Sequence, residues 1–248
     1  MIKLFVTDLD GCISYPFKTP DWETISEIRR LNIQSRTDSL IPPLTVCTGR
    51  PHPYAEAVSQ WLDVRIPFVF ESAAMYHWEG NRVETVLDDE ERALKPITEF
   101  KEWIRKVILP QFPLAGLEFS KMMDAGIVAH QKSVIDRIHP LVLEELERRN
   151  SNLEVHITDV SVNILLPGNN KGRGIKMLAD SQSVGLSEVA YIGDTGGDVP
   201  ALKLVAMPFS PENATRAVKD VSEALPMKTS SAVLEAYRRV IEYNRAAQ

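Results

Sequence analysis

Hydrophobic residues in the first part of the chain occur in short continuous runs separated by helically spaced stretches. The continuous runs Ile2–Thr7, Ile41–Cys47 and Pro67–Phe70 are typical of strands buried on both faces of a parallel sheet. The stretches between them, at about 21–34 and 54–61, have the spacing of helices. This alternation predicts an α/β fold with a doubly wound, Rossmann-like parallel sheet.

The middle of the chain breaks this alternation. We expect helices at Pro96–Leu109 and Ser133–Arg149, each followed by two strands that read as a hairpin. The αββαββ order predicts an antiparallel module inserted into the parallel host. The expected hairpins are Gly116–Lys121 with Ala125–His130, and Leu153–Ile157 with Ser161–Leu166.

The strand–helix alternation returns near residue 169. A helix at Lys171–Ser181, a strand at Glu188–Ile192, a helix from about Val199 and a last helix at Ala232–Tyr243 are expected. The sequence therefore predicts a discontinuous core of residues 1–80 and 169–248, interrupted by an inserted domain at 81–168.

Composition narrows the class of protein. The 248 residues are 44% hydrophobic, which argues against a disordered chain, and no apolar run approaches the roughly 18–20 residues that span a bilayer. The formal charge of −6 argues against a nucleic-acid partner. The first apolar run is too short for a signal peptide, and Cys12 and Cys47 form no disulfide or metal-binding pattern. We expect a cytoplasmic protein with no membrane partner, as a monomer or small homo-oligomer.

Acidic residues follow two of the predicted strands. Asp8 and Asp10 come directly after the first strand, and Asp194 and Asp198 follow the strand that ends at Ile192. Ligands of open parallel sheets bind beyond the carboxyl ends of the strands, and converging carboxylates need a cation. Oxygen ligands without Cys or His favour Mg²⁺. The plainer alternatives are an acidic turn after the first strand and a helix N-cap at Asp198.

Other residues at these strand ends suit an anion. Lys171 opens a helix, where its charge opposes the macrodipole, so a bound anion would explain its position. Thr48 and Gly49 end the second strand and offer a hydroxyl and accessible amides. The alternatives are a solvated lysine and an ordinary strand-to-helix turn. A phosphoryl group bridged to Mg²⁺ fits all of these positions.

The ordered set of motifs resembles the haloacid dehalogenase superfamily of phosphohydrolases. The resemblance rests on Asp8-Leu9-Asp10-Gly11, Thr48-Gly49-Arg50, Lys171 and Gly193–Asp198. It implies that Asp8 is the nucleophile, that Asp10 is the general acid and base, that Thr48 bonds the phosphoryl group and that Lys171 offsets its charge.

The same resemblance implies the metal ligands. Asp8, Asp194 and the backbone carbonyl of Asp10 would bind Mg²⁺, and Asp198 would hold the metal site directly or through water. Asn213 is similar to a late family Asn that orients the metal site, although an exposed helix-start Asn is the alternative.

The αββαββ insertion resembles the class IIB cap of the Cof-like, sucrose-phosphate-phosphatase-like branch. One departure lies after the third strand, where many relatives have Glu-Asn-Gly-Ala and this chain has Glu71-Ser72-Ala73-Ala74. A substrate contact there is therefore not carried over. Gly49 and Arg50 remain candidates for substrate binding, with a surface ion pair as the alternative for Arg50.

The last predicted hairpin has one polar and one apolar face. Alternation places Glu154 and His156 with Ser161 and Asn163, opposite a set that we expect to pack on the two helices of the insertion. The polar face is either in contact with solvent or forms a roof over the phosphoryl site. In the second case His156 and Asn163 would bind substrate.

These observations favour a Mg²⁺-dependent phosphatase that hydrolyses a small phosphorylated metabolite, such as a sugar phosphate or phosphoglycolate, through an aspartyl-phosphate. One alternative is a phosphomutase of the phosphomannomutase type, although those relatives lack the Thr-Gly-Arg found at Thr48–Arg50. The other is a non-catalytic phosphate-ligand binding protein, which the retained acids argue against.

Overall fold

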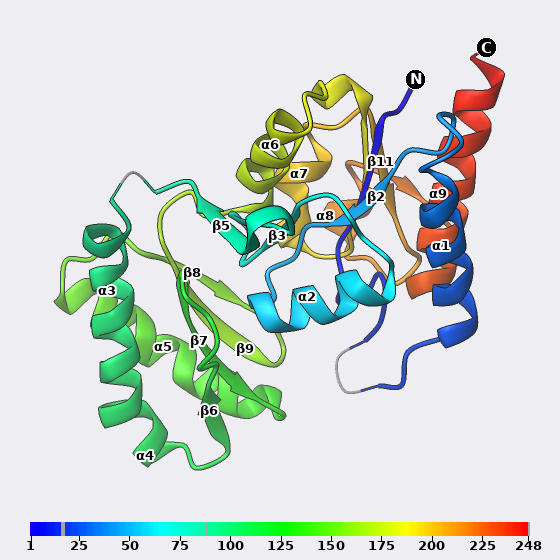
Figure 1. Ribbon diagram of the computed structural model, residues 1–248. Coiled ribbons are helices and arrows are strands. Elements are labelled where there is room, and N and C mark those ends of the chain that lie inside the picture. The colour runs from blue at the N-terminus through cyan, green and yellow to red at the C-terminus, as the bar shows by residue number, and fades with distance from the viewer. Residues whose placement is uncertain (16–17, 88, 248) are drawn as a thin grey trace. The chain divides into compact units, whose positions relative to one another are not determined.

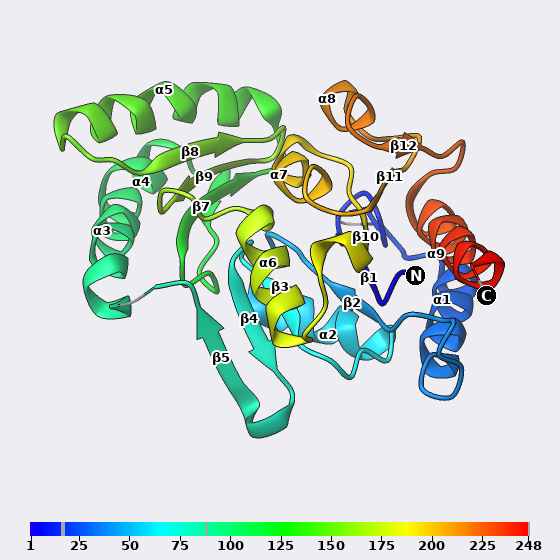
Figure 2. The same cartoon turned by 90° about the horizontal axis from the view of Figure 1, so that it is seen from above.

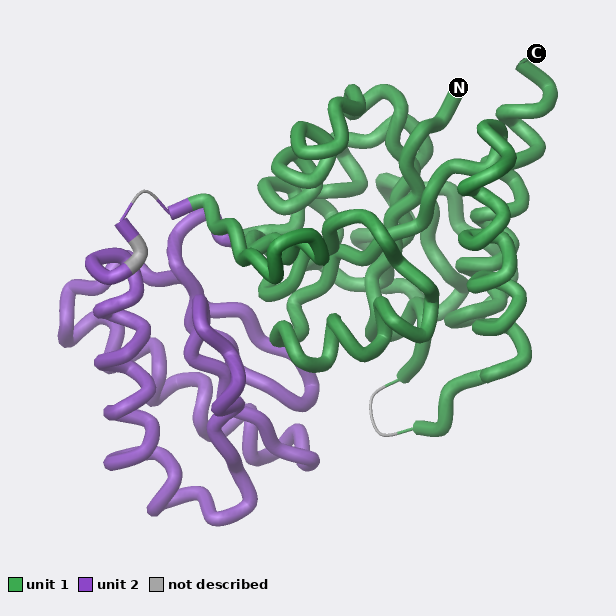
Figure 3. The backbone as a smooth tube through the Cα atoms, viewed as in Figure 1, with its two compact units in different colours: residues 1–86, 170–248 green, residues 87–169 purple. Residues whose placement is uncertain are grey.

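The computed structural model describes residues 1–15, 18–87 and 89–247 (Figure 1). The chain divides into two compact units, residues 1–86 with 170–248, and residues 87–169 (Figure 3). The sequence placed the start of the insertion at 81, but β5 (Arg82–Thr85) pairs antiparallel with β4 (Ala74–His77) and keeps this segment in the first unit. No helix in the described part of the chain is long and apolar enough to cross a membrane.

The first unit contains a parallel sheet in the order β12-β11-β10-β1-β2. The first strand, β1, lies between β2 from the first half of the sequence and β10 from the second half, as the doubly wound prediction requires. The fold class expected from the sequence is confirmed. The strands are β1 (Leu4–Thr7), β2 (Leu44–Val46), β10 (Val189–Ile192), β11 (Met207–Ser210) and β12 (Glu223–Ala224).

Helices cover both faces of this sheet. Leu4 and Val6 of β1 pack into an apolar cluster with residues of α6 (Lys171–Ser181) and α7 (Val199–Leu202). Phe5 points to the other face, since successive strand residues alternate, and stacks on Tyr237 of α9. Figures 1 and 2 both show α9 beside α1. The remaining bounds are α1 (Trp22–Gln34), α2 (His52–Trp61), α8 (Arg216–Lys219) and α9 (Thr229–Ala246).

A second, antiparallel sheet in this unit has the order β3-β4-β5, beginning with β3 (Phe68–Phe70). A parallel bridge between Cys47 and Val69 places β3 next to the end of β2. Glu71 and Ser72, in the turn from β3 to β4, have positive φ angles of 44° and 69°. Their amides donate to the carbonyls of Arg50 and Thr48, so the turn supports the loop after β2.

The second unit has the predicted αββαββ order and an antiparallel sheet in the order β6-β7-β9-β8. Val162, Ile164 and Leu166 pack with apolar residues of the two long helices, as the alternation of the last hairpin predicts. The elements are α3 (Glu90–Trp103), a π-helical segment (Ile104–Ile108), α4 (Leu109–Gln111), β6 (Ala115–Leu117), β7 (Asp124–Ala129), α5 (Lys132–Arg148), β8 (Glu154–Ile157) and β9 (Ser161–Leu165).

Among the predicted helix starts, that of α3 differs most from the structure. The hydrophobic pattern predicts that this helix begins at Pro96. The structure begins α3 at Glu90, where the Asp89 side chain accepts from the Arg92 amide, and Pro96 lies inside the helix. The local capping bond at Asp89 therefore determines the start.

Candidate active site

The candidate site lies in the first unit, at the carboxyl ends of the adjacent strands β1 and β10. Asp8 directly follows β1, and Asp194 comes two residues after the end of β10. The chain continues from β1 to β2 on one side, whereas β10 lies on the other, so this is a topological switch point of the sheet. Such points are where open α/β sheets bind their ligands.

Lys171 is the central cation of the site. It is the first residue of α6 and only 6% exposed, which rules out the solvated-lysine alternative. Its Nζ lies 2.8 Å from Asp8 Oδ2 and 2.6 Å from Asp198 Oδ1. The buried ammonium therefore links the acid after β1 to the acid that precedes α7.

Asp194 is buried and incompletely paired. Among the described residues, its Oδ1 has no hydrogen-bond partner, although the atom is inaccessible to solvent. Gly11 makes room for it, since a Cβ at Gly11 would lie 1.9 Å from Asp194 Oδ2. A buried carboxylate oxygen without a partner is costly, so it indicates a missing cation or donor at this point.

The pKa values of the buried acids also indicate that a cation belongs at this site. Burial, reinforced by the nearby acids, raises the pKa of Asp8 and of Asp194 well above the usual range for aspartate. Burial also opposes ionisation of Asp198, but the Lys171 charge and its hydrogen bonds outweigh burial and lower its pKa. The charges of Asp198 and Asp8 outweigh burial at Lys171 and raise its pKa.

Mg²⁺ fits the residues that are present. Asp8, Asp194 and Asp198 each offer a carboxylate oxygen, and these atoms lie within 4.8 Å of one another. When ionised, the three acids carry three negative charges against the single charge of Lys171. The unpartnered oxygen of Asp194 and the absence of sulfur or imidazole from this acid set favour a hard divalent cation.

Asp198 differs from the other two acids because its oxygens are already engaged. Oδ1 accepts from Lys171 and from the Tyr191 hydroxyl, and Oδ2 accepts from the Asp194 amide and from the amide and hydroxyl of Thr195. Asp198 occupies the N-cap position of α7, but within the described residues its side chain makes no cap bond to that helix and instead accepts from the Thr195 amide in a capping box. Helix capping alone therefore does not account for the contacts of Asp198. Direct metal coordination by Asp198 would require one of these donors to leave.

Asp10 forms a bidentate ion pair with Arg50, whose Nε and Nη2 lie 2.5 and 3.1 Å from the two carboxylate oxygens. The sequence is compatible with Arg50 as a substrate contact or as one half of a surface ion pair, and in the structure Arg50 pairs with the predicted general acid. Thr48 is buried, and its Oγ1 accepts from the Arg50 amide. At Gly49, a Cβ would meet only the Ser72 hydroxyl, at 3.6 Å, so the loop is open there.

Asn213 is not the exposed helix-start residue of the plainer alternative. It is half-buried, and its side-chain amide donates to the Gly11 carbonyl at 2.9 Å. Its carbonyl oxygen accepts from the amide of Thr229, the first residue of α9. Asn213 therefore ties the turn after Asp10 to the start of α9.

His156 and Asn163 lie in the second unit, whereas the other candidate residues lie in the first. They face each other across β8 and β9. Asn163 is engaged, because its Oδ1 accepts from Lys121 and its Nδ2 donates to Ser161. His156 is exposed, which leaves its ring accessible.

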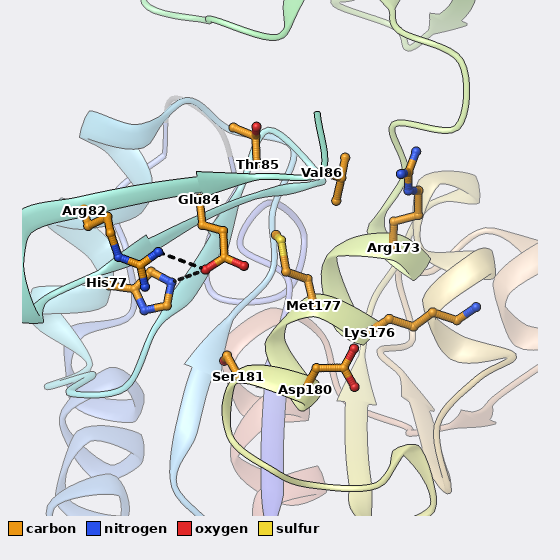
Figure 4. Close-up of a pocket in the computed structure, with 10 residues that line it drawn as sticks. All are labelled: His77, Arg82, Glu84, Thr85, Val86, Arg173, Lys176, Met177, Asp180 and Ser181. Atoms are coloured by element: carbon orange, nitrogen blue, oxygen red, sulfur yellow. Dashed lines mark hydrogen bonds and ion pairs between the residues drawn. The ribbon is translucent and has the colours of Figure 1, made fainter. Parts of the chain in front are cut away.

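A separate hollow of about 780 Å³ lies in the first unit between the β4–β5 hairpin and α6 (Figure 4). His77 and Arg82 point toward Glu84 and pair with it, and Arg173 and Lys176 extend from α6. None of the described acids of the candidate site lines this hollow. This hollow is thus distinct from the place where the residues of the sequence motifs converge.

Tyr191 is a further residue of the site that the sequence motifs do not indicate, and its hydroxyl donates to Asp198. The available signal is a tyrosine within the buried strand Val189–Ile192, because a buried hydroxyl needs a hydrogen-bond partner. The identity of that partner depends on the three-dimensional arrangement of β10 and the loop before α7.

Comparison with known proteins agrees with this geometry. A sequence model of the haloacid dehalogenase-like hydrolase family matches residues 114–236. The chain is 20% identical to a phosphoglycolate phosphatase of Methanopyrus kandleri over 98% of both chains. Protein 0175 of Thermoplasma acidophilum has the same fold, with a TM-score of 0.76, 17% identity and coverage of 97% of this chain and 98% of that one.

A second solved structure, the sucrose-phosphatase of Synechocystis in complex with sucrose and phosphate, has a TM-score of 0.66 at 17% identity. It covers 97% of this chain and 98% of its own, in agreement with the Cof-like branch that the αββαββ insertion indicated. The family match, the fold and the converging motifs agree in their similarity to the haloacid dehalogenase-like hydrolases, and the curated relatives that the chain resembles along nearly its whole length are named phosphatases.

Proposed function

We propose that this protein is a Mg²⁺-dependent phosphatase that hydrolyses a small phosphorylated metabolite through an aspartyl-phosphate at Asp8. The observation that carries the proposal is the buried convergence of Asp8, Lys171 and Asp194, in which one oxygen of Asp194 has no partner among the described residues. Asp8, Asp194 and the Asp10 carbonyl would hold Mg²⁺, with Asp198 supporting the site. The bound metal would neutralise charge on the transferring phosphoryl group.

In the first half-reaction a carboxylate oxygen of Asp8 attacks phosphorus. The bond from phosphorus to the leaving oxygen breaks, and the protonated Asp10 carboxyl gives its proton to that oxygen. The Lys171 ammonium, 2.8 Å from Asp8, offsets negative charge on the phosphoryl group, and the Thr48 hydroxyl donates to it. The product alcohol leaves, and Asp8 carries an acyl phosphate.

In the second half-reaction water attacks the phosphorus of the acyl phosphate. Asp10, now a carboxylate, takes the proton of that water, and the bond from phosphorus to Asp8 breaks. Phosphate is released, and both aspartates return to their starting forms.

The Asp10–Arg50 pair gives Arg50 a part in substrate binding. An arriving phosphate monoester competes with Asp10 for the Arg50 guanidinium, because both are anions that suit its bidentate geometry. We propose that this exchange frees Asp10, which takes up a proton from water once it has left Arg50 and then meets the leaving oxygen. Arg50 stays on the substrate, where the Gly49 amide also lies. Asn213 would hold the Asp8–Gly11 turn in place.

Sugar phosphates and phosphoglycolate are the proposed substrate class, and phosphoglycolate is the first candidate because curated relatives of nearly the same length are named for it. We propose that residues 87–169 act as a cap and that His156 and Asn163 contribute to substrate choice. A cytoplasmic location remains a prediction.

A screen of phosphorylated metabolites with and without Mg²⁺ tests the proposal. It should include phosphoglycolate, several sugar phosphates and an aryl phosphate, with Asp8→Asn as the matched control. We expect phosphate release that requires Mg²⁺, disappears with EDTA and is lost in Asp8→Asn. Transfer of the phosphoryl group to a second sugar would indicate a mutase. Tight phosphate-ester binding without turnover would indicate a binding protein.

A further inference from the structure

Tyr191 is a buried tyrosine whose hydroxyl reaches the candidate site. It lies on β10 and packs in the same apolar cluster as residues of α6 and α7. Its hydroxyl donates to Asp198 Oδ1 at 2.5 Å. Since the side chain is fully buried, this bond gives the phenol a partner that water cannot replace.

The same Asp198 oxygen accepts from Lys171 at 2.6 Å. Two donors, one from β10 and one from α6, thus converge on a single carboxylate oxygen, while the loop after Asp194 holds the other oxygen. Hydrogen bonds to both oxygens therefore fix the orientation of the Asp198 carboxylate. Lys171 is fixed in turn, because its remaining ion pair is to Asp8 at 2.8 Å.

We infer that Tyr191 is a positioning residue that aims the Lys171 ammonium at Asp8 by fixing Asp198. The inference rests on the proposed function for its catalytic consequence, since Lys171 is the group assigned to the phosphoryl charge. Tyr191 acts through Asp198, and its hydroxyl has no assigned contact with the reacting atoms. Loss of this hydroxyl should leave Lys171 present but less constrained.

Tyr237 provides a matched control for a purely structural hydroxyl. It is also fully buried, it stacks on Phe5 with ring centroids 4.7 Å apart, and its hydroxyl donates to the Pro42 carbonyl at 2.6 Å. It lies on the opposite face of the same sheet from Tyr191. Tyr237→Phe therefore removes a comparable buried hydrogen bond without touching Asp198 or Lys171.

The experiment compares Tyr191→Phe with Tyr237→Phe in two assays. In Mg²⁺-dependent hydrolysis of an aryl phosphate, we expect Tyr191→Phe to lower kcat about ten-fold with KM changed less than about two-fold, while Tyr237→Phe stays near wild type. In the second assay, each protein is labelled with a lysine-acylating reagent in the absence of metal, and mass spectrometry measures the labelling of Lys171. We expect Lys171 to react at least about three-fold faster in Tyr191→Phe than in wild type, and at the wild-type rate in Tyr237→Phe. Tyr191→Met provides the same test should Tyr191→Phe not fold, because methionine can fill the space without a hydroxyl.

The two assays separate failure of this inference from failure of the proposed function. A wild-type protein without phosphatase activity would contradict the function, and the labelling of Lys171 would still test the positioning role. Equal kcat in the two Phe variants would overturn the inference. Equal Lys171 labelling in the two variants would also overturn it.

Discussion

At Gly11, both the backbone conformation and the space beside Asp194 require a residue without a side chain. Its φ is +70°, and a Cβ there would overlap Asp194 Oδ2 at 1.9 Å. Gly11→Ala should therefore displace Asp194, lower the stability by about 2 kcal/mol or more, and nearly abolish activity. Thermal unfolding and Mg²⁺-dependent hydrolysis measure these two effects.

Gly80 provides a control that separates backbone strain from displacement of Asp194. Its φ is +75°, but a Cβ there would meet nothing within 4 Å. Gly80→Ala should carry only the backbone strain and keep wild-type kcat. An active Gly11→Ala protein with the small stability loss of Gly80→Ala would show that Asp194 does not need this position.

Asp10 is the residue whose role depends most on the leaving group. Asp10→Asn removes the proton donor, so hydrolysis of sugar phosphates, which have basic leaving alcohols, should fall by about 10²–10⁴-fold. Formation of the acyl phosphate from an activated aryl phosphate should fall much less, and single-turnover release of the aryl alcohol measures this step. Equal losses for both substrates would contradict the role of general acid.

At the scale of elements, the sequence was most informative where hydrophobic runs are long and uninterrupted. The helix at Lys171–Ser181 has the predicted bounds, because Asn170 caps it through the Arg173 amide. The hydrophobic pattern does not indicate the β4–β5 hairpin, although Gly80 and Asn81, which have positive φ, lie in its connecting turn. The preceding β3–β4 turn has positive φ at Glu71 and Ser72, without the Gly or Asn that usually signals such a turn.

The site residues that could be predicted are those whose position follows from the order of strands and helices. Asp8, Lys171 and Asp194 were predictable because the ends of parallel strands and the helices they feed meet at one edge of the sheet. The Asp10–Arg50 pair and the Tyr191–Asp198 bond were not, because each depends on side-chain directions across elements. Periodicity identifies the face of a strand but not the partner of a polar atom.

Glu145 forms ion pairs with two arginines at the C-terminal end of α5, and one of these, Arg149, also contacts α3. It accepts from the guanidinium groups of Arg148 and Arg149, and Arg149 lies over the Phe100 ring at 4.5 Å. Hydrogen bonds from Arg148, opposed by burial and supported by Arg149, lower the Glu145 pKa from the usual 4.5 to about 2. The depressed pKa contributes stability that is fully present above about pH 4.5 and is lost as the pH falls toward 2.

Glu145→Gln should therefore destabilise the protein by about 1–2 kcal/mol at pH 7, and by progressively less as the pH is lowered through 4 to 3. Thermal unfolding at these pH values measures the gap between variant and wild type. Glu147→Gln, on the exposed face of the same helix, is the control and should change little. A gap for Glu145→Gln that stays constant with pH would contradict the ionic role.

At the scale of the whole molecule, the chemistry and the proposed substrate choice belong to different compact units. If the polar face of the second unit contacts substrate, His156→Ala and Asn163→Ala should raise KM several-fold for the best metabolite. The kcat for a small aryl phosphate should be nearly unchanged. Arg105→Ala, an exposed change in the π-helical segment, is the control. Unaltered kinetics in both variants would assign this face to solvent.

The central claim is that Asp8 carries the phosphoryl group during turnover. The most direct test is to quench the working enzyme with acid and locate the phosphoryl group by mass spectrometry, with Asp8→Asn in parallel. We expect one phosphoryl group on the peptide that contains Asp8, lost on treatment with hydroxylamine and absent from Asp8→Asn. Near-wild-type hydrolysis by Asp8→Asn, or a phosphoryl group on another residue, would contradict it.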